Sequence, residues 1–381
     1  MADNLLSEEE SLLRNTVRDY SNDVLATRAA DYDESGLFPW DNFRELGDMG
    51  LLGLGIDEEY GGSGGSTRLV ALAAEEIARG CAATSVVFIA HLSLCTQFIN
   101  RYGNEDQKNK YLPDLASGKK VGAFALTEPG AGSDAAAITT NAVRANGHLV
   151  VNGNKTYISN APEASVIVTL ATRDHSLSYK GIDALIIDGD LDGVTVNKLA
   201  GKMGVRASTV GEIIFDNCHV PVVNQMGGDG VGFRQTMEVL NASRISIAAQ
   251  CVGIAQAALE ASIEYAKNRK AFGGTLSDLQ AIQWMVADMA TETEAARQLV
   301  MNTASLRDAG LPFNTEASMA KLFGSRVAMD AAYKAVQIHG GAGYFSPTPV
   351  ERYFRDARVT EIYEGTSEIQ KMVIARNILT D

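Results

Sequence analysis

Cysteine and histidine are scarce in this sequence, which has four cysteines and five histidines among 381 residues. The cysteines are Cys81, Cys95, Cys218 and Cys251. They form no CxxC pair and have no regular spacing, which argues against a disulfide framework or a structural zinc site. His91 lies one helical turn before Cys95, but two candidate ligands without a third make a poor metal site. We therefore expect buried free thiols and no metal.

Long hydrophobic runs and an excess of positive charge are also missing. No apolar run approaches the ~20 residues that a helix needs to cross a bilayer. The acidic N-terminus, MADNLLSEEE, lacks the pattern of a signal or transit peptide. The 33 lysines and arginines against 47 aspartates and glutamates give a net charge of -14, which opposes attraction to nucleic acid or anionic lipid. We expect a cytoplasmic protein without nucleic-acid or membrane partners.

The glycine fingerprint of a doubly wound dinucleotide fold is absent. No GxGxxG motif follows a predicted strand, and GLLGLG at 50–55 has the wrong spacing. The cluster YGGSGGS at 60–66 lacks the Lys-Ser/Thr ending of a phosphate-binding loop, so a flexible turn is expected there. A dinucleotide, if one binds, does not bind in a Rossmann manner.

The pattern of apolar residues changes twice along the chain. Helical spacing extends from Ser7 to about residue 120, and short β-rich runs follow to about residue 225. The runs are 149–151, which follows an Asn146-Gly147 hairpin turn, then 165–170, 184–187 and 212–215. Long helical patterns return over 237–269, 278–308 and 315–336. The predicted class is α+β, with a helical domain at 1–120, a β domain at 121–228 and a second helical domain at 229–381.

A glycine-containing loop, ALTEPGAGSD at 125–134, leads into the β-rich region. Gly130 and Gly132 leave backbone N–H groups accessible to anionic oxygens, and Thr127 and Ser133 add hydroxyl groups. For this segment alone an ordinary turn with polar caps is the favoured interpretation, and a ligand-binding loop is the alternative.

The segment IYEGTSEIQ at 362–370 places a carboxylate ahead of a helix. Ser367 and Gln370 have the spacing of a capping box, which predicts a helix running to about Leu379. Glu364 then lies just before the helix N-terminus. In isolation, stabilisation of the helix dipole is its simplest role. The same geometry also suits a carboxylate base beside a carbonyl that backbone N–H groups polarise.

Two further segments carry glycines at helix ends. QIHGGAG at 337–343 ends a long helix, where glycines form a C-cap or let another backbone or a cofactor approach. A second segment runs from Arg269 through Phe272 to Ser277 and Gln280. Ser277 and Gln280 again have capping-box spacing, so Gln280 has a sufficient structural explanation.

The order and spacing of these segments resemble the acyl-CoA dehydrogenase family over essentially the whole chain. The matching segments are ALTEPGAGSD, KTYISNA, KMGVRAS, YAKNRKAFGG, QIHGGAGY and IYEGTSEIQ. The resemblance implies an N-terminal helical domain, a central β-barrel-like domain and a C-terminal four-helix bundle. It also implies an FAD flavoprotein of fatty-acid β-oxidation that converts an acyl-CoA to the 2-enoyl-CoA. Such a protein is a homo-oligomer, usually a tetramer, and passes electrons to an electron-transfer flavoprotein.

Carried onto this sequence, the resemblance makes Glu364 the base that removes the α-proton, with hydride passing from Cβ to flavin N5. The matched FAD positions are Leu126, Thr127, Gly132, Ser133, Tyr157, Ser159, Arg269, Phe272, Gln280, Gln337, Gly340, Gly341, Thr366 and Glu368. Those from Arg269 to Gly341 match positions that clasp the FAD of a neighbouring subunit. The matched substrate positions are Ser133, Asn241, Arg244 and Gly365. Burial of a glutamate suits the chemistry, because it raises the pKa of the carboxyl toward working pH.

Three positions differ from patterns found in the family. Tyr157 and Ser159 stand where Trp and Thr are commonest. Both keep a flat ring and a hydroxyl, so we expect retained binding with a shift in flavin potential. In a minority of members the base lies just before the arginine, but here that residue is Ser243, which leaves Glu364 as the only candidate.

The substrate and the electron acceptor are open at this stage. An acyl-CoA oxidase using O2 is one alternative, although such enzymes are usually longer, and an FAD-free acyl-CoA-binding protein is another. Ser85 stands where a glutaryl-CoA type of enzyme has an arginine, which argues against a dicarboxylic substrate. VVFIAHLSLC at 86–95 resembles short-chain and branched-chain members. We expect a short, branched or cyclic acyl group, and a cyclic one would recruit a second acid or base near His91.

Overall fold

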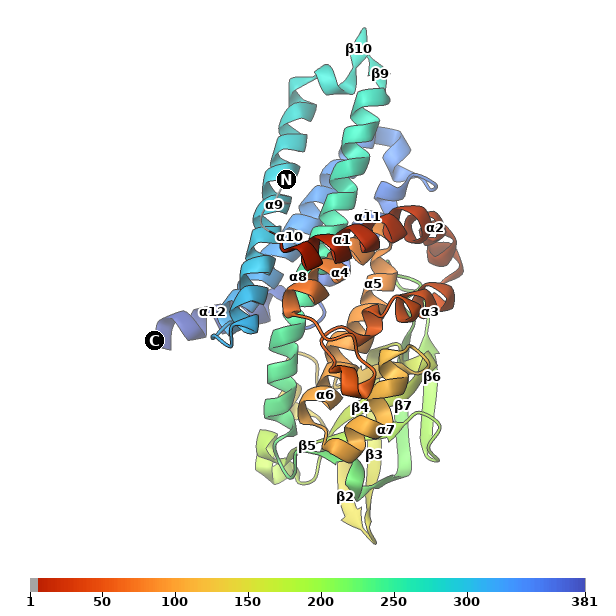
Figure 1. The fold of residues 1–381 in the computed structure, drawn as a ribbon, viewed down its shortest axis with the longest axis vertical. Helices are drawn as coiled ribbons and strands as arrows, with labels where there is room; N and C mark the ends of the chain where they lie inside the picture. Colours follow the sequence, from red (N-terminus) through yellow and green to blue (C-terminus); the bar gives the residue numbers. More distant parts are fainter. Residues whose placement is uncertain (1–5, 381) are drawn as a thin grey trace.

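The computed structural model describes residues 6–380 and has the predicted order of a helical part, a β part and a second helical part (Figure 1). The N-terminal helices are α1 (Glu8–Tyr20), α2 (Ala26–Ser35), α3 (Trp40–Asp48), α4 (Thr67–Gly80), α5 (Ala82–Ile89), α6 (Gln97–Tyr102) and α7 (Glu105–Ala116). A π-helical turn, Ala90–Thr96, joins α5 to α6. A capping box of Ser7 and Glu10 starts α1 at the predicted position.

The central part is one eight-stranded sheet. Its strands are β1 (Val121–Ala125), β2 (Asn141–Ala145), β3 (His148–Ser159), β4 (Ala164–Thr172), β5 (Ile182–Asp188), β6 (Val194–Leu199), β7 (Val210–Pro221) and β8 (Gln225–Met226). Their order is β6-β7-β3-β2-β4-β5-β8, with β1 parallel to β4. Asn146 and Gly147 have φ values of 49° and 80° between β2 and β3, which confirms the predicted hairpin turn.

Strands β4 and β5 separate two hydrophobic cores, because successive side chains of a strand point to opposite faces of the sheet. Val166 and Val168 of β4 belong to the core shared with the helices, whereas Ile167 belongs to a separate core inside the β part. Ile186 and Ile187 of β5 divide in the same way. The helices therefore cover one face of the sheet, where β1 packs against the π-helical turn.

The C-terminal part is built from long helices. They are α8 (Gly232–Asn268), α9 (Gln280–Asp308), α10 (Asn314–His339), α11 (Pro349–Ala357) and α12 (Ser367–Thr380). Helices α8, α9 and α10 pack on one another, and α12 packs on α10. The hairpin of α8 and α9 projects beyond the rest of the chain and ends in a ribbon of β9 (Lys270–Ala271) and β10 (Gly274–Thr275) (Figure 1).

The start of α9 differs from the prediction. Thr275 and Asp278 form a capping box around a short 3-10 turn, and α9 follows after Leu279 without a side-chain cap. The predicted capping box of Ser277 and Gln280 is therefore wrong. Both pairs have the same spacing, so spacing alone does not show where the helix begins.

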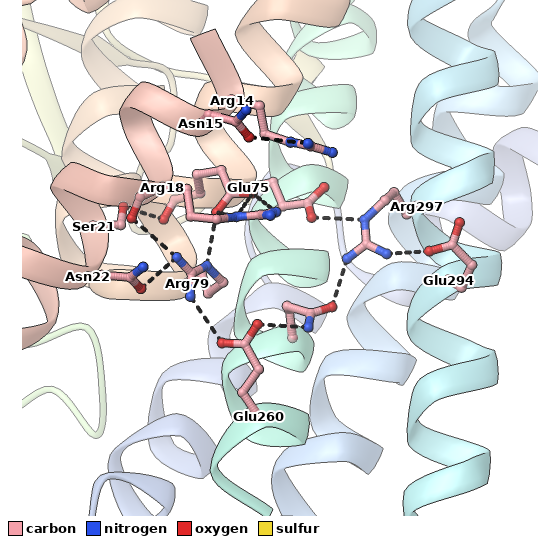
Figure 2. Close-up of polar contacts among 12 residues, drawn as sticks. Arg14, Asn15, Arg18, Ser21, Asn22, Glu75, Arg79, Glu260, Glu294 and Arg297 are labelled. Atoms are coloured by element: carbon pink, nitrogen blue, oxygen red, sulfur yellow. Dashed lines mark hydrogen bonds and ion pairs between the residues drawn. The ribbon is translucent and has the colours of Figure 1, made fainter. Parts of the chain in front are cut away.

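An ion-pair network joins the N-terminal helices to the C-terminal bundle. Arg18 of α1 pairs with Glu76 of α4. Arg297 of α9 pairs with Glu75 of α4 at 2.9 Å (Figure 2). Both glutamates are buried. The arginines border a polar cavity of about 570 Å³ between these helices and α8. The network fixes α4 against helices from both ends of the chain.

Two helical segments, Ala82–Tyr102 and Gly232–Asn268, are long and apolar enough to cross a membrane. The prediction that no apolar run approaches this length is therefore wrong by length and composition. In the folded chain, 89% and 83% of the qualifying windows are buried. Both segments thus serve as core helices, and α8 packs against α4 and α10.

Candidate active site

A cavity of about 230 Å³ lies where the N-terminal helices, the sheet and the C-terminal bundle meet. Its apolar lining comes from α5, the π-helical turn, β1 and α8, and includes Val86, Ile89, Ala90, Leu94, Phe124, Met237, Leu240 and Ile247. Its polar lining consists of Thr127, Ser133, Tyr157, Ser159, Arg244 and Glu364, with the Tyr363 ring beside them. Apolar walls with a few converging polar groups are typical of a small-molecule site.

Nine of the residues singled out in the sequence line this cavity. They are Leu126, Thr127, Gly132, Ser133, Tyr157, Ser159, Arg244, Glu364 and Gly365. They come from the loop after β1, from β3, from α8 and from the turn before α12. The fold thus gathers the predicted base, the predicted flavin loop and the predicted substrate arginine around one space.

A buried ion pair fixes the loop at 126–134. The Lys155 ammonium on β3 donates to a Glu128 carboxylate oxygen at 2.7 Å and to the Leu126 carbonyl at 3.1 Å. The carboxylate also accepts the backbone N–H of Thr139 at 2.6 Å. Burial raises the pKa of Glu128, but the charge of Lys155 and the hydrogen bonds outweigh it and lower this pKa to about 2. The ionised pair holds the loop against β3.

Tyr157 projects from a bulge in β3. The pairing of β3 with β7 shifts register between Lys155 and Ile158, and Tyr157 has a φ of 59°. A bulge re-aims the side chain that it carries. The Tyr157 side chain is 73% exposed and lines the cavity, as does Ser159. An aromatic ring is therefore available to a planar ligand.

Glu364 lies on a strained turn ahead of α12. It has a φ of 50°, and Gly365 has a φ of 94°. A left-handed backbone conformation is unfavourable for a glutamate unless the surrounding structure holds it in place. One carboxylate oxygen is buried without a hydrogen-bond partner. Burial raises the pKa of Glu364 to about 7, while Ser243, Lys321 and Arg244 act in the opposite direction. Such a carboxylate is suited to accept a proton near neutral pH.

Hydrogen bonds from two buried side chains hold this turn. The Lys321 ammonium on α10 donates to the Gly365 carbonyl at 2.8 Å. The Gln370 amide donates to the same carbonyl at 2.9 Å and to the Glu364 carbonyl at 3.2 Å. The orientation of the base thus depends on α10 and α12 together.

Thr366 caps α12, because its hydroxyl accepts the N–H of Ile369 at 3.4 Å. The predicted capping box of Ser367 and Gln370 is wrong, since Gln370 is buried and bonds the preceding turn. The helix itself extends to Thr380, close to the predicted end. Glu368 is exposed in its first turn.

Arg244 is buried on α8. Burial lowers the pKa of its guanidinium, and the negative charge of Glu364 acts in the opposite direction. The guanidinium donates to the Asn241 amide oxygen at 2.5 Å and to the Ser318 hydroxyl at 3.4 Å. Arg244 lines the cavity. Asn241 does not line the cavity, but its side chain accepts a hydrogen bond from Arg244. The two predicted substrate residues therefore occupy different positions relative to the cavity.

Eight predicted cofactor residues do not line the cavity. Two of them, Thr366 and Glu368, lie at the start of α12. The other six are Arg269, Phe272, Gln280, Gln337, Gly340 and Gly341. The first three flank the tip of the α8–α9 hairpin, and the last three lie at the exposed end of α10 (Figure 1). Phe272 is 92% exposed, and a Cβ added at Gly340 or Gly341 would meet nothing within 4 Å. Both segments are open to another molecule.

His91 is buried between α7 and β1 and does not line the cavity. Its Nδ1 accepts the Gly122 N–H at 3.0 Å, and its Nε2 lies 3.1 Å from the Leu115 carbonyl oxygen. Burial lowers the pKa of His91 to about 4. Its position does not support the expected second acid or base. Among residues 6–380, no group of three or more His, Cys, Asp and Glu side chains could hold a metal ion.

The sequence patterns did not indicate the residues that hold the site in place: Glu128, Lys155, Lys321 and Gln370, the last of which was predicted only as part of a capping box. One signal was available for Lys321. It lies inside a long helix with Ala317, Ser318, Gly324 and Ser325 at the three- and four-residue spacings. Without an acidic residue at these positions, a helical lysine has no partner on its own helix. The signal is weak, because most lysines are exposed to solvent, and it does not identify the turn that the Lys321 ammonium contacts.

Three family models match successive parts of the chain: the acyl-CoA dehydrogenase N-terminal domain at residues 7–119, middle domain at 123–218 and C-terminal domain at 230–379. The chain is 44% identical over 373 residues to the short-chain specific acyl-CoA dehydrogenase of Clostridium acetobutylicum, with 98% of each protein covered. It is similar to the structure of butyryl-CoA dehydrogenase from Megasphaera elsdenii, with a TM-score of 0.96, 38% identity and coverage of 98% of this chain and 99% of that one. It is also similar to a chain in a structure described as the electron transferring flavoprotein of Acidaminococcus fermentans, with a TM-score of 0.97, 41% identity and 99% of each chain covered. From the cavity, its lining and these similarities we conclude that the chain belongs to the acyl-CoA dehydrogenase family of FAD-dependent oxidoreductases.

Proposed function

We propose that this enzyme oxidises a short-chain acyl-CoA thioester to the 2-enoyl-CoA, with Glu364 as the base. The position of Glu364 carries this assignment. Its carboxylate lines a mostly apolar cavity, and burial raises its pKa to about 7. A base of this kind is matched to a proton transfer near neutral pH.

The residues around the cavity fit a flavin. Tyr157 offers an exposed ring, and the hydroxyls of Thr127, Ser133 and Ser159 line the same space. A Cβ added at Gly132 would meet nothing within 4 Å, so a ligand can approach the backbone closely there. We assign the flavin to these residues and to Leu126. When bound, FAD supplies the acceptor for the hydride that leaves Cβ of the substrate.

Glu364 takes the proton from Cα in this proposal. The carboxylate must be ionised before the reaction, and it becomes neutral when it accepts the proton. Burial favours that direction, because the charged form of a carboxyl is the one that desolvation destabilises. Arg244, Ser133 and Gly365 all line the cavity, and we assign these three residues to the polar portion of the substrate. Asn241 orients Arg244 through the hydrogen bond between their side chains.

The similarity to the short-chain specific acyl-CoA dehydrogenase of Clostridium acetobutylicum supports a short acyl group. The cavity volume of about 230 Å³ does not set the length of the acyl chain, because the flavin is assigned to the same space. Arg244 is the only basic side chain among the described residues that line it, which disfavours a terminal carboxylate on the substrate. Ser85 does not line the cavity, since its hydroxyl donates to the Ala74 carbonyl at 3.1 Å. The argument against a dicarboxylic substrate therefore rests on the lining and not on Ser85.

A neighbouring subunit completes the cofactor site in this proposal. Arg269, Phe272, Gln280, Gln337, Gly340 and Gly341 lie on exposed segments away from the cavity of their own chain, which suits contacts with the FAD of a neighbour. Thr366 and Glu368 are assigned further FAD contacts. We infer a homotetramer that passes electrons to an electron-transfer flavoprotein. The net charge of -14 and the burial of both long apolar helices disfavour a membrane location, and we propose the cytoplasm.

Anaerobic bleaching of the bound flavin tests the substrate class. The purified enzyme is titrated in parallel with butyryl-, isobutyryl-, octanoyl-, glutaryl- and cyclohexanecarbonyl-CoA. We expect butyryl-CoA or isobutyryl-CoA to bleach the flavin fastest and glutaryl-CoA to leave it oxidised. Fastest bleaching by octanoyl-CoA would contradict the short-chain assignment. Rapid reoxidation of the reduced enzyme by air would instead favour the oxidase alternative.

A further inference from the structure

Lys321 is a fully buried lysine beside the turn that carries Glu364. Its side chain has 0% exposure and is among the largest buried side chains of the chain. Its ammonium donates to the Gly365 carbonyl at 2.8 Å. Burial lowers the pKa of the ammonium to about 8, while the charges of Glu364 and Glu361 raise this pKa and the charge of Arg244 lowers it, so Lys321 is mostly charged at pH 7. A buried ammonium is costly unless hydrogen bonds and opposite charge compensate for its desolvation.

The turn that Lys321 contacts does not hold its conformation unaided. Glu364 and Gly365 have φ values of 50° and 94°, and the first of these is unfavourable for a residue with a Cβ. The Gly365 carbonyl is fixed twice, by the Lys321 ammonium and by the Gln370 amide. Gln370 contributes hydrogen bonds to the Gly365 and Glu364 carbonyls but no charge, whereas Lys321 contributes a hydrogen bond and a charge.

We propose that Lys321 is a positioning residue for the catalytic base: it fixes the Glu364–Gly365 turn through the Gly365 carbonyl, and its charge favours the ionised form of the Glu364 carboxylate. This inference rests on the assignment of Glu364 as the base. It assigns a positioning role to a residue on α10, whose ammonium contacts the turn and does not line the cavity.

The groups around Glu364 come from three elements. Ser243 and Arg244 face it from α8, Lys321 faces it from α10, and Tyr363 precedes it on the same turn. Lys321 and Arg244 are its two neighbouring cations, and each lowers the pKa of the carboxyl. Removing the charge of Lys321 should therefore raise this pKa and leave less of the base ionised at neutral pH.

Variants at two positions separate the hydrogen bond from the charge. Lys321→Met removes both, Lys321→Gln removes the charge but keeps a donor, and Gln370→Met removes a donor but no charge. Lys334→Met on the same helix is the matched control, because Lys334 pairs with Asp330 at 2.7 Å. The FAD-loaded variants are mixed anaerobically with saturating butyryl-CoA, and the rate of flavin reduction is measured as a function of pH.

We expect Lys321→Met to slow flavin reduction about tenfold or more at pH 7, since small misplacements of a catalytic group are costly. Its pH midpoint should move upward. Lys321→Gln should show the same upward shift of the pH midpoint, with a smaller loss of rate at high pH. Gln370→Met should reduce its flavin more slowly than the wild type, with an unshifted pH midpoint. Lys334→Met should match the wild type. KM for butyryl-CoA should change little in all four.

A normal rate and an unshifted midpoint in Lys321→Met would overturn the proposal. A lysine that only stabilises the fold would lower the melting temperature and FAD content but leave the midpoint in place. If neither Lys321 variant folds, Gln370→Met decides, and an unchanged rate in it would refute the positioning role. Glu364→Gln is measured in parallel: if it reduces its flavin normally, the assignment of the base has failed, and the Lys321 inference fails with it.

Discussion

Glu364 determines the pH dependence expected of the reaction. Burial raises its pKa to about 7, and the base must be ionised to accept a proton. The rate of flavin reduction should rise about tenfold per pH unit below about pH 7 and level off above it. Stopped-flow traces at butyryl-CoA concentrations far below saturation check this prediction, because they report the pKa of the free enzyme. A rate that falls as pH rises through neutrality would contradict it.

The same pKa has a consequence for stability, with the opposite sign. A carboxyl whose pKa is higher in the folded state than in the unfolded chain binds its proton more tightly when folded. The contribution of Glu364 to stability is therefore present at low pH and is lost as pH rises from about 4.5 to about 7. The ionised form that catalysis requires is the less favourable one for folding.

Tyr157 should contribute to FAD affinity through its ring and not through its hydroxyl. The bulge in β3 exposes the ring beside the cavity. Aromatic stacking contributes about 1 kcal/mol beyond the area that it buries, so Tyr157→Ala should weaken FAD binding about fivefold or more. Tyr157→Phe is the matched control and should bind normally. Reconstitution of apoenzyme with FAD measures both, and equal affinities would refute the assignment.

At the scale of elements, the pair of Glu128 and Lys155 should control the stability of the loop after β1. Both side chains are buried. Removing one partner of a buried pair costs about 3–5 kcal/mol, because the other is left as an uncompensated charge. Lys155→Met should lower the melting temperature and the FAD content, and Lys155→Met with Glu128→Gln should recover part of both. An unchanged melting temperature in the single variant would show that the pair is unimportant.

The elements also show where the sequence was informative and where it was not. The long helices and the Asn146-Gly147 hairpin followed from periodicity and turn chemistry, which are local properties. Both capping boxes predicted in the C-terminal part were wrong, at Ser277 and at Ser367. In each case a neighbouring threonine caps the turn, and a choice between adjacent candidates depends on tertiary contacts that spacing does not encode.

At the scale of the molecule, the exposed tip of the α8–α9 hairpin should bind the FAD of another subunit. Phe272 lies at this tip with 92% of its side chain exposed. Phe272→Ala should lower FAD retention while leaving the helix content unchanged, because the residue is almost fully exposed. Gel filtration with light scattering and flavin absorbance measure assembly and occupancy. A monomer with a full complement of FAD would contradict the shared site.

The order of the three parts was predictable because composition changes along the chain near residues 121 and 232. Glu364 as the base also came from the sequence, through resemblance and not through periodicity, and this role stays a prediction. The residues that hold the proposed base in place, such as Lys321, could not be predicted from resemblance or from periodicity. Lys321 and Gly365 are 44 positions apart along the chain, and only the packing of α10 against α12 brings them together.

The reaction of Glu364→Gln with butyryl-CoA under anaerobic conditions tests the central claim most directly. The variant keeps the size of the side chain and can still donate and accept hydrogen bonds, so FAD should bind as it does in the wild type. The account predicts a yellow enzyme that binds butyryl-CoA without flavin bleaching. Bleaching at the wild-type rate would show that another group removes the proton, and would contradict the assignment of Glu364 as the base.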